Sequence, residues 1–143
     1  MLKDLGFLQA LNDHLENFNL EDLLGYRCQP PYNCISSPII KRNIVPLWEC
    51  GVELTYFNKD TNHFEQCSLE AIDAPYFCAK SPQAVLANIF IYLYEDELSE
   101  VQLRAVASKV GFLHLERLLT SISNNQGNEY EAWRSNFIIS CEG

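Results

Sequence analysis

Cysteine and histidine residues are the side chains of this sequence best suited to nucleophilic or metal chemistry. The cysteines are Cys28, Cys34, Cys50, Cys67, Cys78 and Cys141, and the histidines are His14, His63 and His114. A cysteine nucleophile needs a histidine and an orienting group beside it, and no local motif pairs them here. The sequence also has no Cys-x-x-Cys pair, which zinc ribbons and redox motifs require. We therefore expect the cysteines to be small apolar residues in or near the core.

Metal, phosphate and acid–base sites are not indicated either. Cys50, His63 and Cys67 form the closest group of metal ligands, but His63 and Cys67 would lie about 13 Å apart on one strand. The six glycines never cluster as a phosphate-binding loop requires. The acidic residues 95–97 and Glu100 are typical of a solvated helix junction. No cofactor and no metal are therefore expected.

Recognition of a protein partner is the chemistry that remains. Aromatic and acidic residues concentrate between residues 44 and 77. Aromatic residues anchor protein interfaces when they are exposed within a polar rim, although they form a sheet–helix core when they are buried. The candidate contact residues are Trp48, Glu49, Glu53, Tyr56, Asp60 and Glu65.

The charge of the chain restricts the class of partner. Its 143 residues include 19 acidic and 10 basic ones, a formal net charge of −9. Such a surface repels nucleic-acid phosphates and attracts a basic protein, although it also serves solubility. No run approaches the ~18 apolar residues of a membrane span, and Asp4 lies where a secretory signal would be apolar. We expect a cytoplasmic protein that binds neither nucleic acid nor membrane.

The first half of the chain predicts a helix followed by a sheet. Leucines recur at helical spacing over residues 2–18. Residues 39–48 are expected to be extended, with Pro46 at a sheet edge or a bulge. Strands over 52–57 and 63–69 flank the polar turn 58–62, which predicts a β-hairpin.

The second half predicts helices. Ser81-Pro82 is typical of a helix start, and this helix should run to about Tyr94. Ser99 with Gln102 predicts a capping box, and Gly111 should end that helix. Another helix is expected over 112–123, so that the two form a helical hairpin. Residues 130–141 remain open between a helical turn at 131–134 and a strand at 137–140.

Three segments resemble the SUKH superfamily, which contains bacterial immunity proteins and yeast regulators of cell-wall synthesis. They are the strand with proline and an aromatic at 44–48, the strand 52–57 followed by a turn and Phe64, and the serine-led helix start at 79–86. The likeness covers about half the chain, and residues 99–123 look like an appended element. It implies an α+β fold without catalysis that acts by binding a toxin or another protein.

We therefore expect one α+β domain over residues 1–143, with a SUKH-like core at 1–98 and an appended segment at 99–143. Its sheet should be mainly antiparallel, with four to six strands, and packed by N-terminal and C-terminal helices. The expected function is a non-enzymatic, immunity-like module that occludes a basic partner. A small enzyme using a cysteine or paired carboxylates, and a homo-oligomeric structural subunit, are the alternatives.

Overall fold

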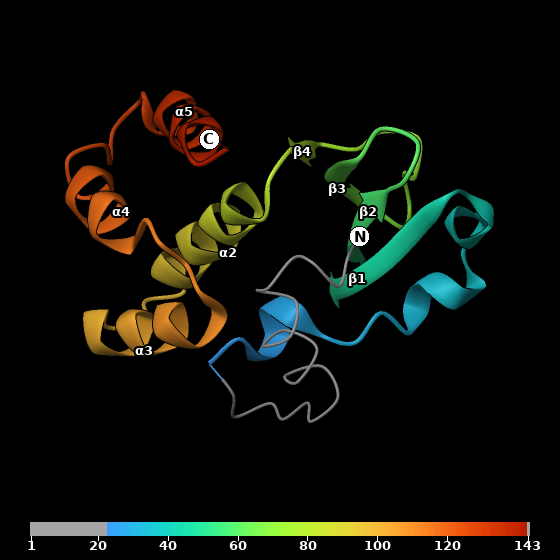
Figure 1. The fold of residues 1–143 in the computed structure, drawn as a ribbon, viewed down its shortest axis with the longest axis horizontal. Coiled ribbons are helices and arrows are strands. Elements are labelled where there is room, and N and C mark those ends of the chain that lie inside the picture. Colours follow the sequence, from blue (N-terminus) through green and yellow to red (C-terminus); the bar gives the residue numbers. More distant parts are fainter. Residues whose placement is uncertain (1–22, 143) are drawn as a thin grey trace. The chain divides into compact units, whose positions relative to one another are not determined.

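The computed structural model describes residues 23–142 and shows an α+β fold, as predicted (Figure 1). Contacts divide the described residues into two compact units, 23–80 and 81–142, and each is described by itself. The first contains the sheet and three short 3-10 helices, and the second contains the described α-helices. The predicted helix over residues 2–18 lies outside the described residues. The predicted boundary at residue 98 stays a prediction.

The first unit is built on a four-stranded antiparallel sheet. Its strands are β1 (Ile44–Cys50), β2 (Glu53–Asn58), β3 (His63–Ser68) and β4 (Phe77–Ala79). Their spatial order is β1-β2-β3-β4, so each strand pairs with its neighbour in the sequence. This arrangement confirms the expected antiparallel sheet and the hairpin formed by β2 and β3.

Local sequence explains the two irregular points of the sheet. The pairing of β1 with β2 shifts register between Pro46 and Trp48, which is the bulge that proline favours in a strand. In the β2–β3 turn, Asn62 has a φ of 58°, a left-handed conformation that asparagine tolerates. The Asn58 side chain accepts a hydrogen bond from the Asp60 N–H at 3.0 Å, which closes the turn.

Between residue 23 and the sheet lie three short 3-10 helices: η2 (Gly25–Cys28), η3 (Asn33–Ser36) and η4 (Pro38–Lys41). The expectation that residues 39–41 are extended was therefore wrong. Ser37 caps η4 by accepting a hydrogen bond from the Ile39 N–H, and Pro38 occupies the first turn, where its missing N–H costs nothing.

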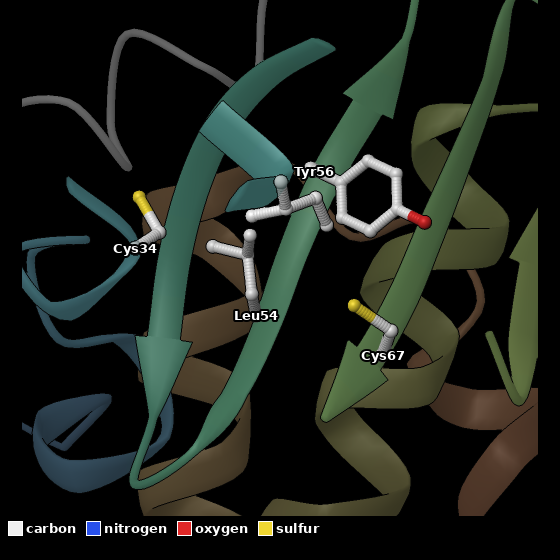
Figure 2. Packing of buried hydrophobic residues seen from close by; sticks show 5 residues of the cluster. Cys34, Leu54, Tyr56 and Cys67 are labelled. Carbon is white, nitrogen blue, oxygen red and sulfur yellow. The ribbon is translucent and has the colours of Figure 1, made fainter. Parts of the chain in front are cut away.

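One face of the sheet packs on a small apolar cluster. Figure 2 shows this cluster beside β2 and β3, where Leu54 and Cys67 are register partners. The buried members are Cys34, Ile39, Leu54, Tyr56 and Cys67. Five of the six cysteines are buried, as expected, and Cys78 is exposed.

The second unit consists of α2 (Pro82–Glu95), α3 (Glu100–Val110), α4 (Leu115–Ile122) and α5 (Tyr130–Ser140). Ser81 caps α2 through the Ala84 N–H, as its position before Pro82 predicts. Within α2 the apolar side chains are buried on nearly all sides of the helix, as is usual for a helix that is apolar around most of its surface. No helix in the described part of the chain combines the length and the apolar character that crossing a membrane requires.

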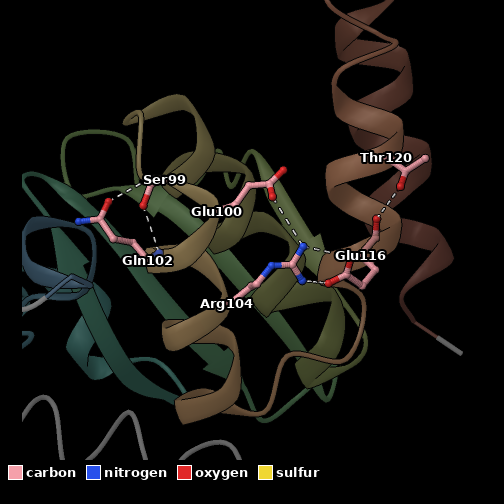
Figure 3. A network of polar contacts seen from close by, with 6 residues as sticks. All are labelled: Ser99, Glu100, Gln102, Arg104, Glu116 and Thr120. Carbon is pink, nitrogen blue, oxygen red and sulfur yellow. Dashed lines mark hydrogen bonds and ion pairs between the residues drawn. The ribbon is translucent and has the colours of Figure 1, made fainter.

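The α3 helix has the predicted caps at both ends. Ser99 accepts a hydrogen bond from the Gln102 N–H, and the Gln102 side chain accepts one from the Ser99 N–H (Figure 3). Gly111 ends the helix with a φ of 77°. Arg104 forms ion pairs with Glu100 in the same helix and with Glu116 in α4. The helical hairpin of α3 and α4 stays a prediction.

Residues 130–140 form the helix α5, so the alternative of a strand at 137–140 was wrong. Trp133 and Phe137 are four residues apart, and their rings lie 5.8 Å from each other on α5. Phe137 and Ile138 are buried. Aromatic residues at positions i and i+4 favour a helix, whereas the β-branched pair Ile138-Ile139 favours a strand. Here the segment is helical, because packing determines the secondary structure of such short apolar runs.

Candidate functional site

Strand pairing places several polar side chains on one face of the sheet. Glu65 of β3 is the register partner of Tyr56 on β2 and of Cys78 on β4. Asn58 and His63 form the neighbouring pair toward the hairpin turn. Because alternate residues of a strand share a face, these five side chains lie on the same side of the sheet.

A pocket of about 320 Å³ opens on this face within the first unit. Its walls come from the segment before β1, from β2 and its turn, from β3, and from the loop after β3. The lining residues are Arg42, Asn43, Ile44, Tyr56, Asn58, Asp60, Glu65, Ile72, Asp73 and Pro75. The pocket therefore brings together three of the six predicted contact residues, namely Tyr56, Asp60 and Glu65.

The Glu65 carboxylate is held in place by its neighbours on β2. Its Oε2 accepts a hydrogen bond from the Tyr56 hydroxyl at 2.7 Å, and its Oε1 accepts one from Asn58 Nδ2 at 3.3 Å. Burial, and then the adjacent Glu65, raise the pKa of Tyr56 well above its usual range. Tyr56 therefore stays protonated, and its hydroxyl donates a hydrogen bond to Glu65 that fixes the carboxylate at the pocket wall.

Asp60 lies in the exposed turn at the pocket rim. Its Oδ1 accepts a hydrogen bond from Asn43 Nδ2 at 2.8 Å, so the turn is tied to the segment before β1. The other lone pairs of the carboxylate remain available to a ligand, because a carboxylate offers about four acceptor positions.

Arg42 balances part of the acidic charge. Its guanidinium forms an ion pair with Asp73 and donates to the Ile72 carbonyl at 3.1 Å. Among residues 23–142, Asp60 and Glu65 have no such cationic partner. The lining therefore carries three carboxylates against one guanidinium, a formal excess of two negative charges.

The pocket is suited to a cation that carries hydrogen-bond donors. Two carboxylates supply acceptors, whereas Ile44, Ile72 and Pro75 supply apolar wall. A guanidinium or ammonium group on an aliphatic stem matches both features, because such side chains bury the stem and keep the charged end at polar groups. Polarity, size and accessibility thus make this pocket the candidate functional site.

Trp48 and Glu49 lie outside the pocket, and both are buried, with 3% and 1% of their surface exposed. The Glu49 carboxylate accepts hydrogen bonds from the Cys34 N–H at 2.7 Å and from the Asn33 N–H at 3.2 Å. Those N–H groups belong to the first turn of η3, so Glu49 acts as its cap. Glu53 is half-buried at the start of β2 and does not line the pocket. A contact role for these three residues stays a prediction.

Arg42, Asn43 and Asp73 are lining residues that the sequence analysis did not select. Ile44 pairs with Asn58, so residues 42–43 must lie beside the hairpin turn. The predicted hairpin and the predicted β1 strand together could have indicated this. Asp73 lies in an irregular loop, and no periodic signal marks its position.

The sequence does not indicate a thiol or metal site, and Cys50, His63 and Cys67, the group nearest to one, do not lie together as a cluster in the structure. Cys50 and Cys67 are buried, whereas His63 is half-buried and lies beside Cys78, with Nδ1 3.4 Å from Sγ. Over residues 23–142, no three side chains of the ligating types converge on one point.

Known proteins give no further guide to this site. Comparison of the chain with protein-family models, with curated proteins and with solved structures found no match. The resemblance to the SUKH superfamily stays a prediction, and any function must be argued from the pocket itself.

Proposed function

We propose that this protein is a non-enzymatic binding module that holds an arginine or lysine side chain of a basic protein partner in the pocket on its sheet. The observation that carries the proposal is the acidic lining, in which Glu65 is fixed by Tyr56 and Asp60 stands at the rim. A prearranged carboxylate lowers the ordering cost of binding, since the acceptor is already in position.

Size and charge support the same ligand class. The volume falls at the lower end of the range of about 300–1,000 Å³ that is usual for ligand pockets, which suits one side chain better than a cofactor. The formal net charge of −9 attracts a basic protein over distances comparable to the Debye length. Thus the whole chain favours encounter and the pocket favours a specific contact.

More specifically, we propose that the basic partner is a toxin, which the chain neutralises by occlusion. The resemblance to the SUKH superfamily is the ground for choosing a toxin. The acidic pocket is compatible with it, because a basic side chain held there would be removed from the toxin's own target.

The ligand class is tested by titrating the isotope-labelled protein with N-acetyl-arginine amide and following the backbone amide resonances. Shifts are expected at the lining residues, with a dissociation constant on the order of a millimolar for so small a ligand. N-acetyl-citrulline amide has nearly the same shape without the charge, and it should produce no saturable shift.

Variants then locate the binding. D60N and E65Q keep the shape of each side chain and remove its charge, so both should weaken binding of the arginine derivative about tenfold or more. E70Q is the matched control, because Glu70 is exposed in the same unit and does not line the pocket. Equal binding by all three variants, or saturable binding of the citrulline derivative, would contradict the proposal.

A further inference from the structure

Cys78 differs from every other cysteine of the chain. It is exposed on β4, whereas Cys28, Cys34, Cys50, Cys67 and Cys141 are buried. Its Sγ lies 3.4 Å from His63 Nδ1, which is within hydrogen-bond distance for sulfur. The pair belongs to the first unit and does not line the pocket described above.

The sheet register creates this pair. Cys78 lies opposite Glu65, so His63 is its diagonal neighbour on β3 and shares its face of the sheet. Among the described strands, β4 is the last of the sheet, so its thiol can be approached from the side. The pairing could not be seen in the sequence, because no strand was expected between residue 69 and the helix that starts at Ser81.

The remaining cysteines are protected from the same chemistry. Burial raises the pKa of Cys34, Cys50, Cys67 and Cys141, so these thiols stay protonated at neutral pH. A protonated, buried thiol is a poor nucleophile, because the thiolate is the attacking species. Any thiol reagent therefore meets one accessible sulfur in the folded chain.

We propose that Cys78 and His63 form a reactive thiol–imidazole site that is modified by low-molecular-weight disulfides, with a preference for cationic ones. His63 takes the thiol proton, and the Cys78 sulfur attacks one sulfur of the disulfide. A new S–S bond forms to Cys78 while the reagent's own S–S bond breaks. Cys78 is oxidised, one half of the reagent is reduced, and the departing thiolate receives the proton from His63.

The preference for a cation follows from the neighbours of the site. Glu65 lies opposite Cys78 in the sheet register, and the chain carries a formal net charge of −9. An ammonium group on the reagent is attracted by this carboxylate, whereas a carboxylate on the reagent is repelled. Cystamine should therefore react faster than the neutral hydroxyethyl disulfide, and glutathione disulfide should react slowest.

The test follows adduct formation by intact-protein mass spectrometry and peptide mapping on the folded full chain. Cystamine should add once, at residue 78, and C78S should give no adduct, whereas the chain unfolded in guanidinium should react at all six cysteines. H63Q should slow the folded reaction on the order of tenfold, because the thiol loses its proton acceptor. H114Q is the matched control and should react like the unaltered chain.

Unfolded samples of each variant supply the internal reference, since the contribution of His63 requires the folded sheet. H63Q and the unaltered chain should react equally in guanidinium, and E65Q should reduce the advantage of cystamine over glutathione disulfide. Equal folded rates for H63Q and the unaltered chain, or adducts spread over several cysteines of the folded chain, would overturn the proposal. Neither result bears on cation binding in the pocket, so the two proposals fail independently.

Discussion

At the scale of single residues, the structure separates two acidic side chains that look alike in the sequence. Glu49 and Glu65 both lie on strands and both have aromatic neighbours in the sequence. Glu49 is buried and accepts hydrogen bonds from two backbone N–H groups, whereas Glu65 lines an open pocket. Glu49 therefore stabilises the fold, and Glu65 is the residue available to a ligand.

Replacement of Glu49 by alanine should destabilise the protein strongly. The change leaves the buried N–H of Cys34 and the part-buried N–H of Asn33 without their acceptor. A loss of about 3 kcal/mol in the free energy of unfolding is expected, because a buried N–H left without a partner costs about 1–3 kcal/mol. Urea denaturation followed by circular dichroism measures this loss.

Two further variants give that measurement its control. E49Q keeps one acceptor oxygen and should lose less than E49A, whereas E70A removes an exposed carboxylate and should change stability by less than about 0.5 kcal/mol. If E49A were as stable as E70A, the capping of η3 by Glu49 would be of no energetic consequence.

At the scale of elements, the capping box at Ser99 offers the clearest test. Ser99 and Gln102 are both exposed, so their exchanged hydrogen bonds can be removed without opening a cavity (Figure 3). S99A should lower the free energy of unfolding by about 1 kcal/mol, the usual cost of losing an N-cap. Faster hydrogen exchange at the Gln102 amide should accompany this loss.

A second serine provides the comparison for S99A. Ser123 follows α4, and its hydroxyl donates to the Thr120 carbonyl instead of accepting from an N–H. S123A should therefore change stability by no more than a few tenths of a kcal/mol. Equal effects of S99A and S123A would show that the capping box does not stabilise α3.

Elements that depend on local chemistry could be predicted from the sequence. The starts of α2 and α3, the end of α3 at Gly111 and the bulge near Pro46 all follow from one or two residues. The 3-10 helix at 38–41 and the helix α5 could not, because their apolar residues fit strand and helix equally well. Tertiary packing determines whether such segments become helix or strand.

The candidate site could be predicted only in part. All six candidates were selected as aromatic or acidic residues near the hairpin, and the three that line the pocket, Tyr56, Asp60 and Glu65, lie on that hairpin. Trp48 and Glu49 were selected by residue type, and type alone does not reveal burial. The pair of Cys78 with His63 requires the register of β3 and β4, which no short-range signal predicts.

At the scale of the whole molecule, a basic ligand can be attracted by the net charge of the chain or by contact with the pocket carboxylates, and the two contributions must be distinguished. A chain with a formal charge of −9 attracts any polycation, and salt suppresses that attraction because it acts over distances near the Debye length. Contact with Asp60 and Glu65 acts over a few ångströms and should survive salt better. A comparison at equal net charge separates the two.

Two double variants, D60N/E65Q and E70Q/E131Q, remove the same charge from the pocket and from exposed positions elsewhere. For a short arginine-rich peptide in low salt, both should bind more weakly than the unaltered chain, because both lose two negative charges. Near physiological ionic strength, where the Debye length is about 8 Å, E70Q/E131Q should approach the unaltered chain and D60N/E65Q should remain weaker. Isothermal titration calorimetry at two salt concentrations measures the difference. If the two double variants lost affinity equally at every salt concentration, overall charge alone would account for the attraction, and the pocket would have no specific role in it.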